Sequence, residues 1–197
     1  MTANVKGLLI DDDKMTWKNT LYYVTDIRHL AFSDTIIQKR TNFVKTGMAE
    51  KVWMKIKLDS GIEIKIAIMD NPIFLGLIGD RSNEVRTLRS IYGYLAKATF
   101  QKRLSTYIDQ VERNGWFDYD KCRFIPRKMI VYKDKEFHIG KDSFLKAAGY
   151  VELRSRDYGA LDKIKREVSF VWPPHFKTKE DYDVIFALLK HYFNLSW

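Results

Sequence analysis

One helix-like stretch, residues 83–114, constrains the fold of this chain more than any other feature. Apolar residues recur there every three or four positions, which is the spacing of one face of an α-helix. At about 1.5 Å per residue, an unbroken helix of this length exceeds about 40 Å. Gly93 is its weak point and Asn114-Gly115 its predicted end, because glycine costs roughly 1 kcal/mol in a helix interior but suits a C-terminal cap. The apolar stripe consists of Val85, Leu88, Ile91, Tyr92, Leu95, Phe100, Leu104, Tyr107, Ile108 and Val111.

Length and composition narrow the class of protein. The chain has 197 residues, 46% of them hydrophobic, which suits one large domain or two small ones. Its single cysteine, Cys122, excludes a disulfide framework and a cysteine metal cluster. No apolar run approaches the roughly 20 residues of a transmembrane helix, and the first residues lack the apolar core of a signal peptide. We therefore expect a cytoplasmic protein without a transmembrane segment.

The formal charge of +9 invites a nucleic-acid or membrane interpretation. Its distribution argues against a single basic tail. Residues 1–115 carry 18 Lys and Arg against 13 Asp and Glu, and residues 116–197 carry 16 against 12. The excess is therefore +5 in the first part and +4 in the second. A spread excess of this kind is typical of a solvated surface.

Strand-like segments lie on both sides of the long helix. The clearest are residues 52–58 and 62–68, where apolar and polar residues alternate around a turn at residues 59–61, which predicts a hairpin. Residues 39–51 are predicted to be a mobile loop. After the helix, short strands are expected up to residues 168–172, and a second helix at residues 179–193. The predicted domains are 1–115 and 116–197.

A faint internal similarity supports two related parts. Residues 17–24 (WKNTLYYV) can be laid over residues 132–139 (YKDKEFHI), so that an aromatic residue, a lysine, a turn residue and a β-branched residue recur in register. Eight positions can also match by chance. A tandem repeat is therefore a hypothesis that only the fold can support.

Short antiparallel strands followed by one helix resemble the order of a pleckstrin-homology-like domain. The first half is similar to the bacterial pleckstrin-homology-like and GRAM-like proteins in residues 15–17, in residues 21–27, and in the 52–69 hairpin with its helix. The resemblance implies an α+β fold of two antiparallel β-barrel or sandwich modules, each closed by a C-terminal helix, the first helix long. It implies a binding scaffold without a cofactor, because this superfold hosts many functions.

The resemblance also implies a place for an anion. Phosphoinositide-binding members of the family use basic residues between the first two strands. That loop is acidic in the first half, at residues 11–13, and basic in the second half. If either part binds an anion, the second should. The candidate anion-binding or partner-binding residues are Arg123, Arg127, Lys128, Lys133 and Lys135.

Other chemistry-bearing residues do not form a recognisable catalytic or metal site. Residues 11–13 (DDD) lack the further ligands of a calcium loop and fit a hairpin turn. The four histidines have no paired spacing. The carboxylate pairs Asp118/Asp120 and Asp181/Asp183 suit turns or helix N-termini. We therefore expect no enzyme activity, metal or cofactor.

Aromatic residues alternate with lysines in residues 53–57 (WMKIK) and 132–135 (YKDK). Such segments can stack bases and hold phosphates. We interpret them as ordinary amphipathic strands, in which lysine on the outer face also protects a sheet edge. The sequence thus predicts a non-enzymatic binding or scaffold protein whose partner is a protein segment or an anionic membrane surface. A basic nucleic-acid-binding protein is the alternative.

Overall fold

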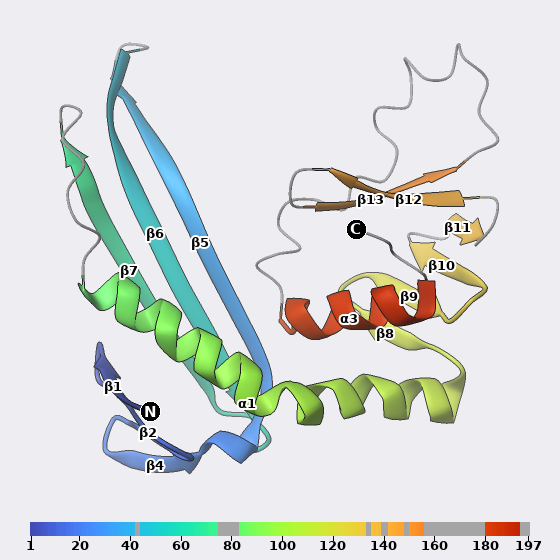
Figure 1. The fold of residues 1–197 in the computed structure, drawn as a ribbon, viewed down its shortest axis with the longest axis horizontal. Helices are drawn as coiled ribbons and strands as arrows, with labels where there is room; N and C mark the ends of the chain where they lie inside the picture. The colour runs from blue at the N-terminus through green and yellow to red at the C-terminus, as the bar shows by residue number, and fades with distance from the viewer. Residues whose placement is uncertain are drawn as a thin grey trace. The chain divides into compact units, whose positions relative to one another are not determined.

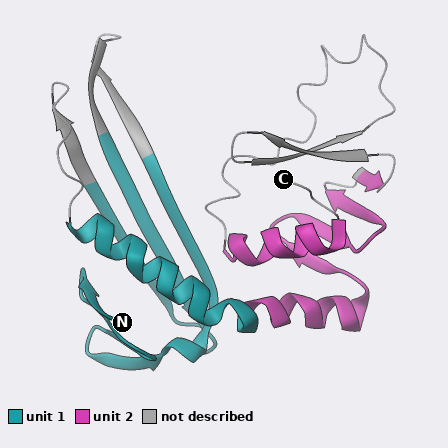
Figure 2. Ribbon diagram, viewed as in Figure 1, with its two compact units in different colours: residues 1–102 teal, residues 103–197 magenta. Residues whose placement is uncertain are grey.

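The computed structural model describes residues 1–41, 44–74, 83–132, 135–138, 142–147, 150–155 and 180–193. The chain divides into two compact units, residues 1–102 and 103–197 (Figure 2). The division falls between Lys102 and Arg103, inside the long helix, whereas the sequence placed the domain boundary after Gly115. Each unit is described by itself.

The described residues of unit 1 form seven strands, a short 3-10 helix and the first part of the long helix, and Figure 1 draws them. Four short strands form one antiparallel sheet in the order β1-β2-β3-β4, and three long strands form another in the order β5-β6-β7. The elements are β1 (Thr2–Val5), β2 (Leu8–Asp11), β3 (Lys14–Trp17), β4 (Thr20–Tyr23), η1 (Val24–Asp26), β5 (Ile27–Thr41), β6 (Val44–Leu58), β7 (Glu63–Phe74) and α1 (Asn83–Asn114).

One hydrophobic core joins both sheets of unit 1 to the first half of α1. Alternation explains the contribution of the strands, since every second residue is buried in residues 51–58 of β6 and 63–69 of β7. The helix contributes residues spaced three or four apart, which lie on one face. The central members are Leu8, Ile10, Met15, Ile27, Leu30, Met54, Ile56, Leu58, Ile64, Val85, Leu88, Ile91 and Leu95, each at most 1% exposed.

The predicted hairpin at residues 52–68 is confirmed, because β6 and β7 pair antiparallel from Lys57↔Glu63 outwards. The Leu58 N–H donates to the Ile62 carbonyl at 2.9 Å, and Gly61 takes the left-handed conformation that closes the turn. The loop predicted at residues 39–51 is wrong, since β5 continues to Thr41 and β6 begins at Val44. A polar composition suggested a loop there, but ladder pairing with β5 extends the strand.

The described residues of unit 2 form the second part of α1, six strands and the helix α3. Its strands form one sheet in the order β11-β10-β9-β8 and a two-stranded sheet, β12-β13. The buried apolar residues include Phe117, Phe124, Ile130, Ile185 and Leu188. The elements are β8 (Phe117–Tyr119), β9 (Cys122–Ile125), β10 (Met129–Tyr132), β11 (Lys135–His138), β12 (Asp142–Ala147), β13 (Tyr150–Ser155) and α3 (Tyr182–Phe193). The strand predicted at 168–172 lies outside the described residues.

The long helix is confirmed as one element, α1, of 32 residues, about 48 Å at 1.5 Å per residue. Gly93 does not interrupt it. The helix ends where the Gly115 N–H donates to the Val111 carbonyl at 2.7 Å, with Gly115 in the left-handed conformation. The apolar stripe predicted from the sequence is only partly right, because Thr99 and Arg103 are buried on the same helix.

The α+β class is correct, but the expected pair of barrel or sandwich modules, each closed by its own helix, is wrong. Among the described strands, four separate antiparallel sheets occur and none closes into a barrel. In unit 1 the 3-10 helix at Val24–Asp26 separates the two ladders. The helix α1 contributes to both units rather than closing one module.

The β1–β4 and β8–β11 sheets share one strand order, a four-stranded meander. The strand pairs β3–β4 and β10–β11 occupy corresponding positions in the two meanders. These are the segments in which the sequence similarity lies. A true tandem repeat nevertheless stays a prediction.

Candidate functional site

The outer face of the β5–β7 sheet carries four lysines in regular order. We call it the lysine face. Cross-strand register defines it, because β6 pairs with β5 on one side and with β7 on the other. The side chains on this face alternate with those of the core. Its four rows are His29-Lys57-Glu63, Ala31-Lys55-Lys65, Ser33-Trp53-Ala67 and Thr35-Lys51-Met69.

Sheet order changes the interpretation of these lysines. Strand β6, which carries Lys51, Lys55 and Lys57, is the middle strand of its sheet. Lysine protects an exposed edge from pairing with another chain, but a middle strand has no exposed edge. Edge protection therefore explains Lys65 on β7 and does not explain the three lysines on β6.

The lysines of the lysine face lie close enough to one another to lower the stability of the sheet. Lys55 and Lys65 are directly opposite each other in register, where like charges are destabilising. Glu63 reduces this repulsion, since its carboxylate lies 2.7 Å from Lys65 Nζ and 3.6 Å from Lys55 Nζ. The hydrogen bond from Lys65 lowers the pKa of Glu63. Four lysines against one glutamate leave the face with a net charge of +3.

Trp53 lies on the same strand as three of these lysines, β6, between Lys51 and Lys55. Its in-register neighbours are short, Ser33 on β5 and Ala67 on β7. The indole is half-buried, while Ala67 is exposed. An aromatic ring therefore lies on the sheet surface with lysines before and after it.

The five basic residues predicted as an anion site are only partly described. Arg127 and Lys128 lie together and exposed in the turn between β9 and β10. Arg123 lies on β9, where its guanidinium donates to Asp118 at 3.0 Å and is 4.7 Å from the ring centre of Trp116. Lys133 lies outside the described residues, and Lys135 is placed only as a β11 residue opposite Tyr132. The anion site stays a prediction.

The β9–β10 turn has one unusual backbone conformation. The Lys128 N–H donates to the Ile125 carbonyl at 3.1 Å, with Pro126 and Arg127 between them. Arg127 has a φ of 57°, a left-handed value that glycine adopts without strain. Proline followed by a left-handed residue is the arrangement of a type II turn. An arginine in this place costs stability that glycine would not, and it projects charge from the tip of the hairpin.

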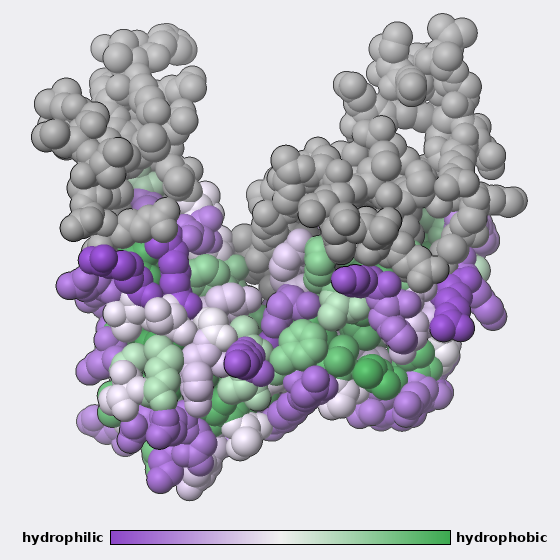
Figure 3. Space-filling view, in the orientation of Figure 1, coloured by the Kyte–Doolittle hydropathy of each residue, from purple (hydrophilic) through white to green (hydrophobic). Residues whose placement is uncertain are grey.

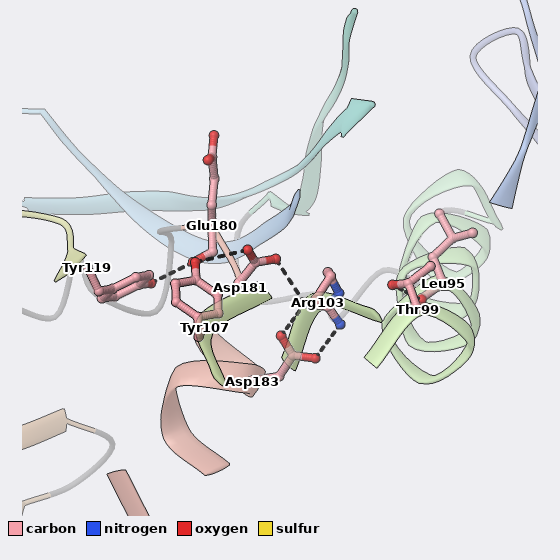
Figure 4. A network of polar contacts seen from close by, with 8 residues as sticks. All are labelled: Leu95, Thr99, Arg103, Tyr107, Tyr119, Glu180, Asp181 and Asp183. Atoms are coloured by element: carbon pink, nitrogen blue, oxygen red, sulfur yellow. Dashed lines mark hydrogen bonds and ion pairs between the residues drawn. The ribbon is translucent and has the colours of Figure 1, made fainter. Parts of the chain in front are cut away.

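A buried polar cluster in unit 2 was missed by the sequence analysis (Figure 4). Arg103 and Asp181 are 0% exposed. The Arg103 guanidinium donates two parallel hydrogen bonds to Asp183, both 2.7 Å, and one to Asp181 at 3.1 Å. The Tyr107 hydroxyl donates to the other Asp181 oxygen at 3.1 Å. These contacts tie α1 to the start of α3.

The local backbone explains how Asp181 reaches this cluster. Its carbonyl accepts from the Ile185 N–H at 2.9 Å, which makes Asp181 the N-cap of α3. Its φ of 54° is left-handed and turns its side chain towards Arg103 and Tyr107.

Electrostatics of the cluster follow from burial and pairing. Burial alone would lower the pKa of Arg103, but its bonds to Asp183 and the charge of Asp181 outweigh burial and raise it. Burial, with the nearby carboxylates, raises the pKa of Tyr107 and of Tyr119, whose hydroxyl donates to the Glu180 carbonyl at 2.6 Å. Each group named here is engaged with another, so the cluster has the character of a structural latch rather than a reaction centre.

Unit 1 has a smaller counterpart of this latch. Arg89 on α1 donates through Nε to Asp34 at 2.8 Å and also binds Glu50, which is 4% exposed. The two arginines, fourteen residues apart on one helix, thus each bind two carboxylates within their own unit. Among the described residues, no group of three or more His, Cys, Asp or Glu is placed to hold a metal ion.

Residues 11–13 form the turn between β2 and β3, as predicted, with Asp12 left-handed at a φ of 47°. Cys122 is buried in β9. Within the described part of the chain, no helix has the length and apolarity needed to cross a bilayer. Comparisons with protein-family models, curated proteins and solved structures find no significant match.

Proposed function

We propose that this protein is a non-enzymatic binding protein that holds a polyanion on the lysine face of unit 1. The observation that carries the proposal is the row of lysines on β6, the middle strand, where edge protection gives no reason for them. Alternate residues of a strand are about 6.7 Å apart and point to the same side, so Lys51, Lys55 and Lys57 follow one line. A linear polyanion can follow that line and release its counterions.

The like-charge pair Lys55–Lys65 supports the same function. A directly opposed pair of lysines lowers sheet stability, by a few tenths of a kcal/mol up to about 1 kcal/mol. A bound anion would attract both lysines and so offset their mutual repulsion. The face is open on the β7 side, where the Lys65 side chain is 70% exposed.

The proposal is tested by titrating the full-length chain into fluorescein-labelled heparin across a salt series. We expect the logarithm of the affinity to fall linearly with the logarithm of salt concentration. The double variant Lys51→Gln/Lys57→Gln should bind about tenfold more weakly and with a shallower salt slope. The matched control Lys14→Gln/Lys97→Gln removes two exposed lysines of unit 1 away from the face. Equal weakening by the control, or affinity independent of salt, would contradict the proposal.

The β9–β10 turn supports a second candidate, the docking of unit 2 on an anionic membrane surface. The supporting observation is Arg127 in a left-handed conformation at the exposed tip of the hairpin, beside Lys128. Vesicles that contain phosphatidylserine, in a flotation assay, test this candidate. Binding should be lost in Arg127→Gly/Lys128→Gln, because glycine preserves the turn while the charges are removed. Retained binding by this variant would reject the candidate.

A further inference from the structure

The lysine face contains one element that a polyanion site does not need, the indole of Trp53. Phosphate or sulfate groups are held by charge alone, so heparin would gain little from an aromatic ring. Trp53 nevertheless lies among the lysines of β6, with Lys51 two residues before it and Lys55 two residues after it. A ring in this position is suited to contacting something that lies between successive anionic groups.

Register leaves space for a flat group on this ring. The residues directly opposite Trp53 are Ser33 and Ala67, whose side chains are too short to stand over an indole. On the β5 side Ser33 is only 6% exposed, so other atoms already cover it, whereas Ala67 on the β7 side is exposed. A planar ligand can therefore approach the indole from the β7 side, above Ala67.

Of the polyanions, single-stranded nucleic acid combines anionic groups with planar ones. Its bases stack on aromatic side chains, whatever their sequence, while lysines follow its backbone. A duplex keeps its base faces inside the stack, where Trp53 cannot reach them. Membrane insertion would require apolar side chains that project past the lysines. Among the residues of this face, only Met69 is a large apolar residue that is exposed, at 61%.

We propose that the lysine face binds single-stranded nucleic acid, with one base stacked on Trp53 and the flanking phosphates held by Lys51, Lys55 and Lys57. This inference rests on the function proposed above and names the class of polyanion. It gives different roles to the two kinds of residue on β6. The lysines supply an affinity that depends on salt, and Trp53 supplies a preference for unpaired bases.

The test compares three probes on the full-length chain: a labelled oligothymidine of about 12 nucleotides, its duplex with oligoadenine, and labelled heparin. A fourth measurement uses vesicles of phosphatidylcholine and phosphatidylserine. Trp53→Leu should weaken single-strand binding about tenfold and leave heparin binding within about twofold. Trp53→Tyr should restore most of the single-strand affinity, since tyrosine also stacks. An oligouridine of the same length distinguishes RNA from DNA.

Fluorescence supplies a second measurement that does not depend on the folding of Trp53→Leu. The chain has five tryptophans, so the Trp53 component is the difference between the wild-type protein and Trp53→Phe. We expect oligothymidine to quench this component and heparin to leave it unchanged. An unquenched Trp53 component in the presence of bound oligothymidine would overturn the inference.

The outcomes separate this inference from the proposed function. One outcome would contradict this inference but not the proposed function. In that outcome, heparin binding depends on the lysines, and oligothymidine binding is unchanged when Trp53 is substituted. Tighter binding to the duplex or to vesicles than to oligothymidine would have the same effect. Failure of both heparin and oligothymidine to bind would sink the proposed function as well.

Discussion

Arg103 is the side chain on which the packing of unit 2 depends most. It is fully buried and is surrounded by Asp181 and Asp183, and its two bonds to Asp183 have the fork geometry that makes arginine–carboxylate pairs strong. A buried charge that loses its partner is destabilising, whether or not the intact pair adds net stability. Removing Arg103 therefore has a larger effect than the pair itself is worth.

We expect Arg103→Met to lower the free energy of unfolding of unit 2 by about 3–5 kcal/mol, because Asp181 stays buried without its cation. Urea denaturation measures this loss, and labelling of buried Cys122 by a thiol reagent should become faster in the same variant. Arg113→Met, an exposed change on the same helix, is the control and should stay within about 0.5 kcal/mol. An Arg103→Met variant with an unchanged free energy of unfolding would show that the latch does not stabilise the packing of unit 2.

Cys122 makes unit 2 sensitive to alkaline pH. Burial, with the charge of Asp120, raises the pKa of its thiol to about 12. The unfolded thiol ionises near about pH 8.5, so the folded state holds the proton longer and stability is lost as pH rises from about 8.5 towards 12. Urea midpoints measured across this range should fall. Cys122→Ala should reduce the fall without abolishing it, because Tyr107 and Tyr119 titrate in the same direction; an unchanged pH profile would show that the thiol does not contribute.

The strand β6 shows how the meaning of a residue depends on its element. Alternation in the sequence placed its lysines on one face, and the structure confirms that prediction. The sequence could not show that β6 is the middle strand, because alternation within one strand does not determine which strands pair with it. The lysines changed from edge protection to a candidate site only when the strand order was known.

Glu63 limits the charge of this sheet face and allows a direct test of it. Glu63→Gln removes the carboxylate that binds Lys55 and Lys65, so we expect affinity for labelled heparin to rise several-fold at low salt. The gain should diminish at high salt, as an electrostatic effect does. Glu84→Gln, on α1, is the matched control. A fall in affinity in Glu63→Gln would mean that the lysines need Glu63 to hold their positions.

The helix α1 carries one residue that weakens it without a packing reason. A methyl group added at Gly93 meets no atom within 4 Å, and Gly93 does not have a positive φ. Gly93→Ala should therefore raise the free energy of unfolding by about 0.5–1 kcal/mol, measured by urea denaturation. Gly61→Ala is the control, because Gly61 has a φ of +85° and should lose stability. A destabilising Gly93→Ala would indicate that glycine is needed at this position.

The chain consists of two units that share one helix, and periodicity in the sequence found that helix and the β6–β7 hairpin. Periodicity could not predict the latch, because Arg103 and Asp181 are 78 residues apart and no sequence pattern links them. The barrel modules were predicted from the order of strands and helices and from a resemblance in residues 15–17, 21–27 and 52–69. Neither of these determines which strands pair. On the face that Figure 3 draws, hydrophilic and hydrophobic residues are intermixed.

The central claim, that β6 and β7 of unit 1 present a polyanion-binding face, is tested most directly by lysine footprinting. The full-length protein is acetylated with and without oligothymidine, and modification of each lysine is measured by mass spectrometry. We predict protection of Lys51, Lys57 and Lys65, with Lys97 and Lys128 modified equally in both samples. Protection of Lys128 with unchanged modification of the β6 and β7 lysines would contradict the claim and place the anion at the β9–β10 turn.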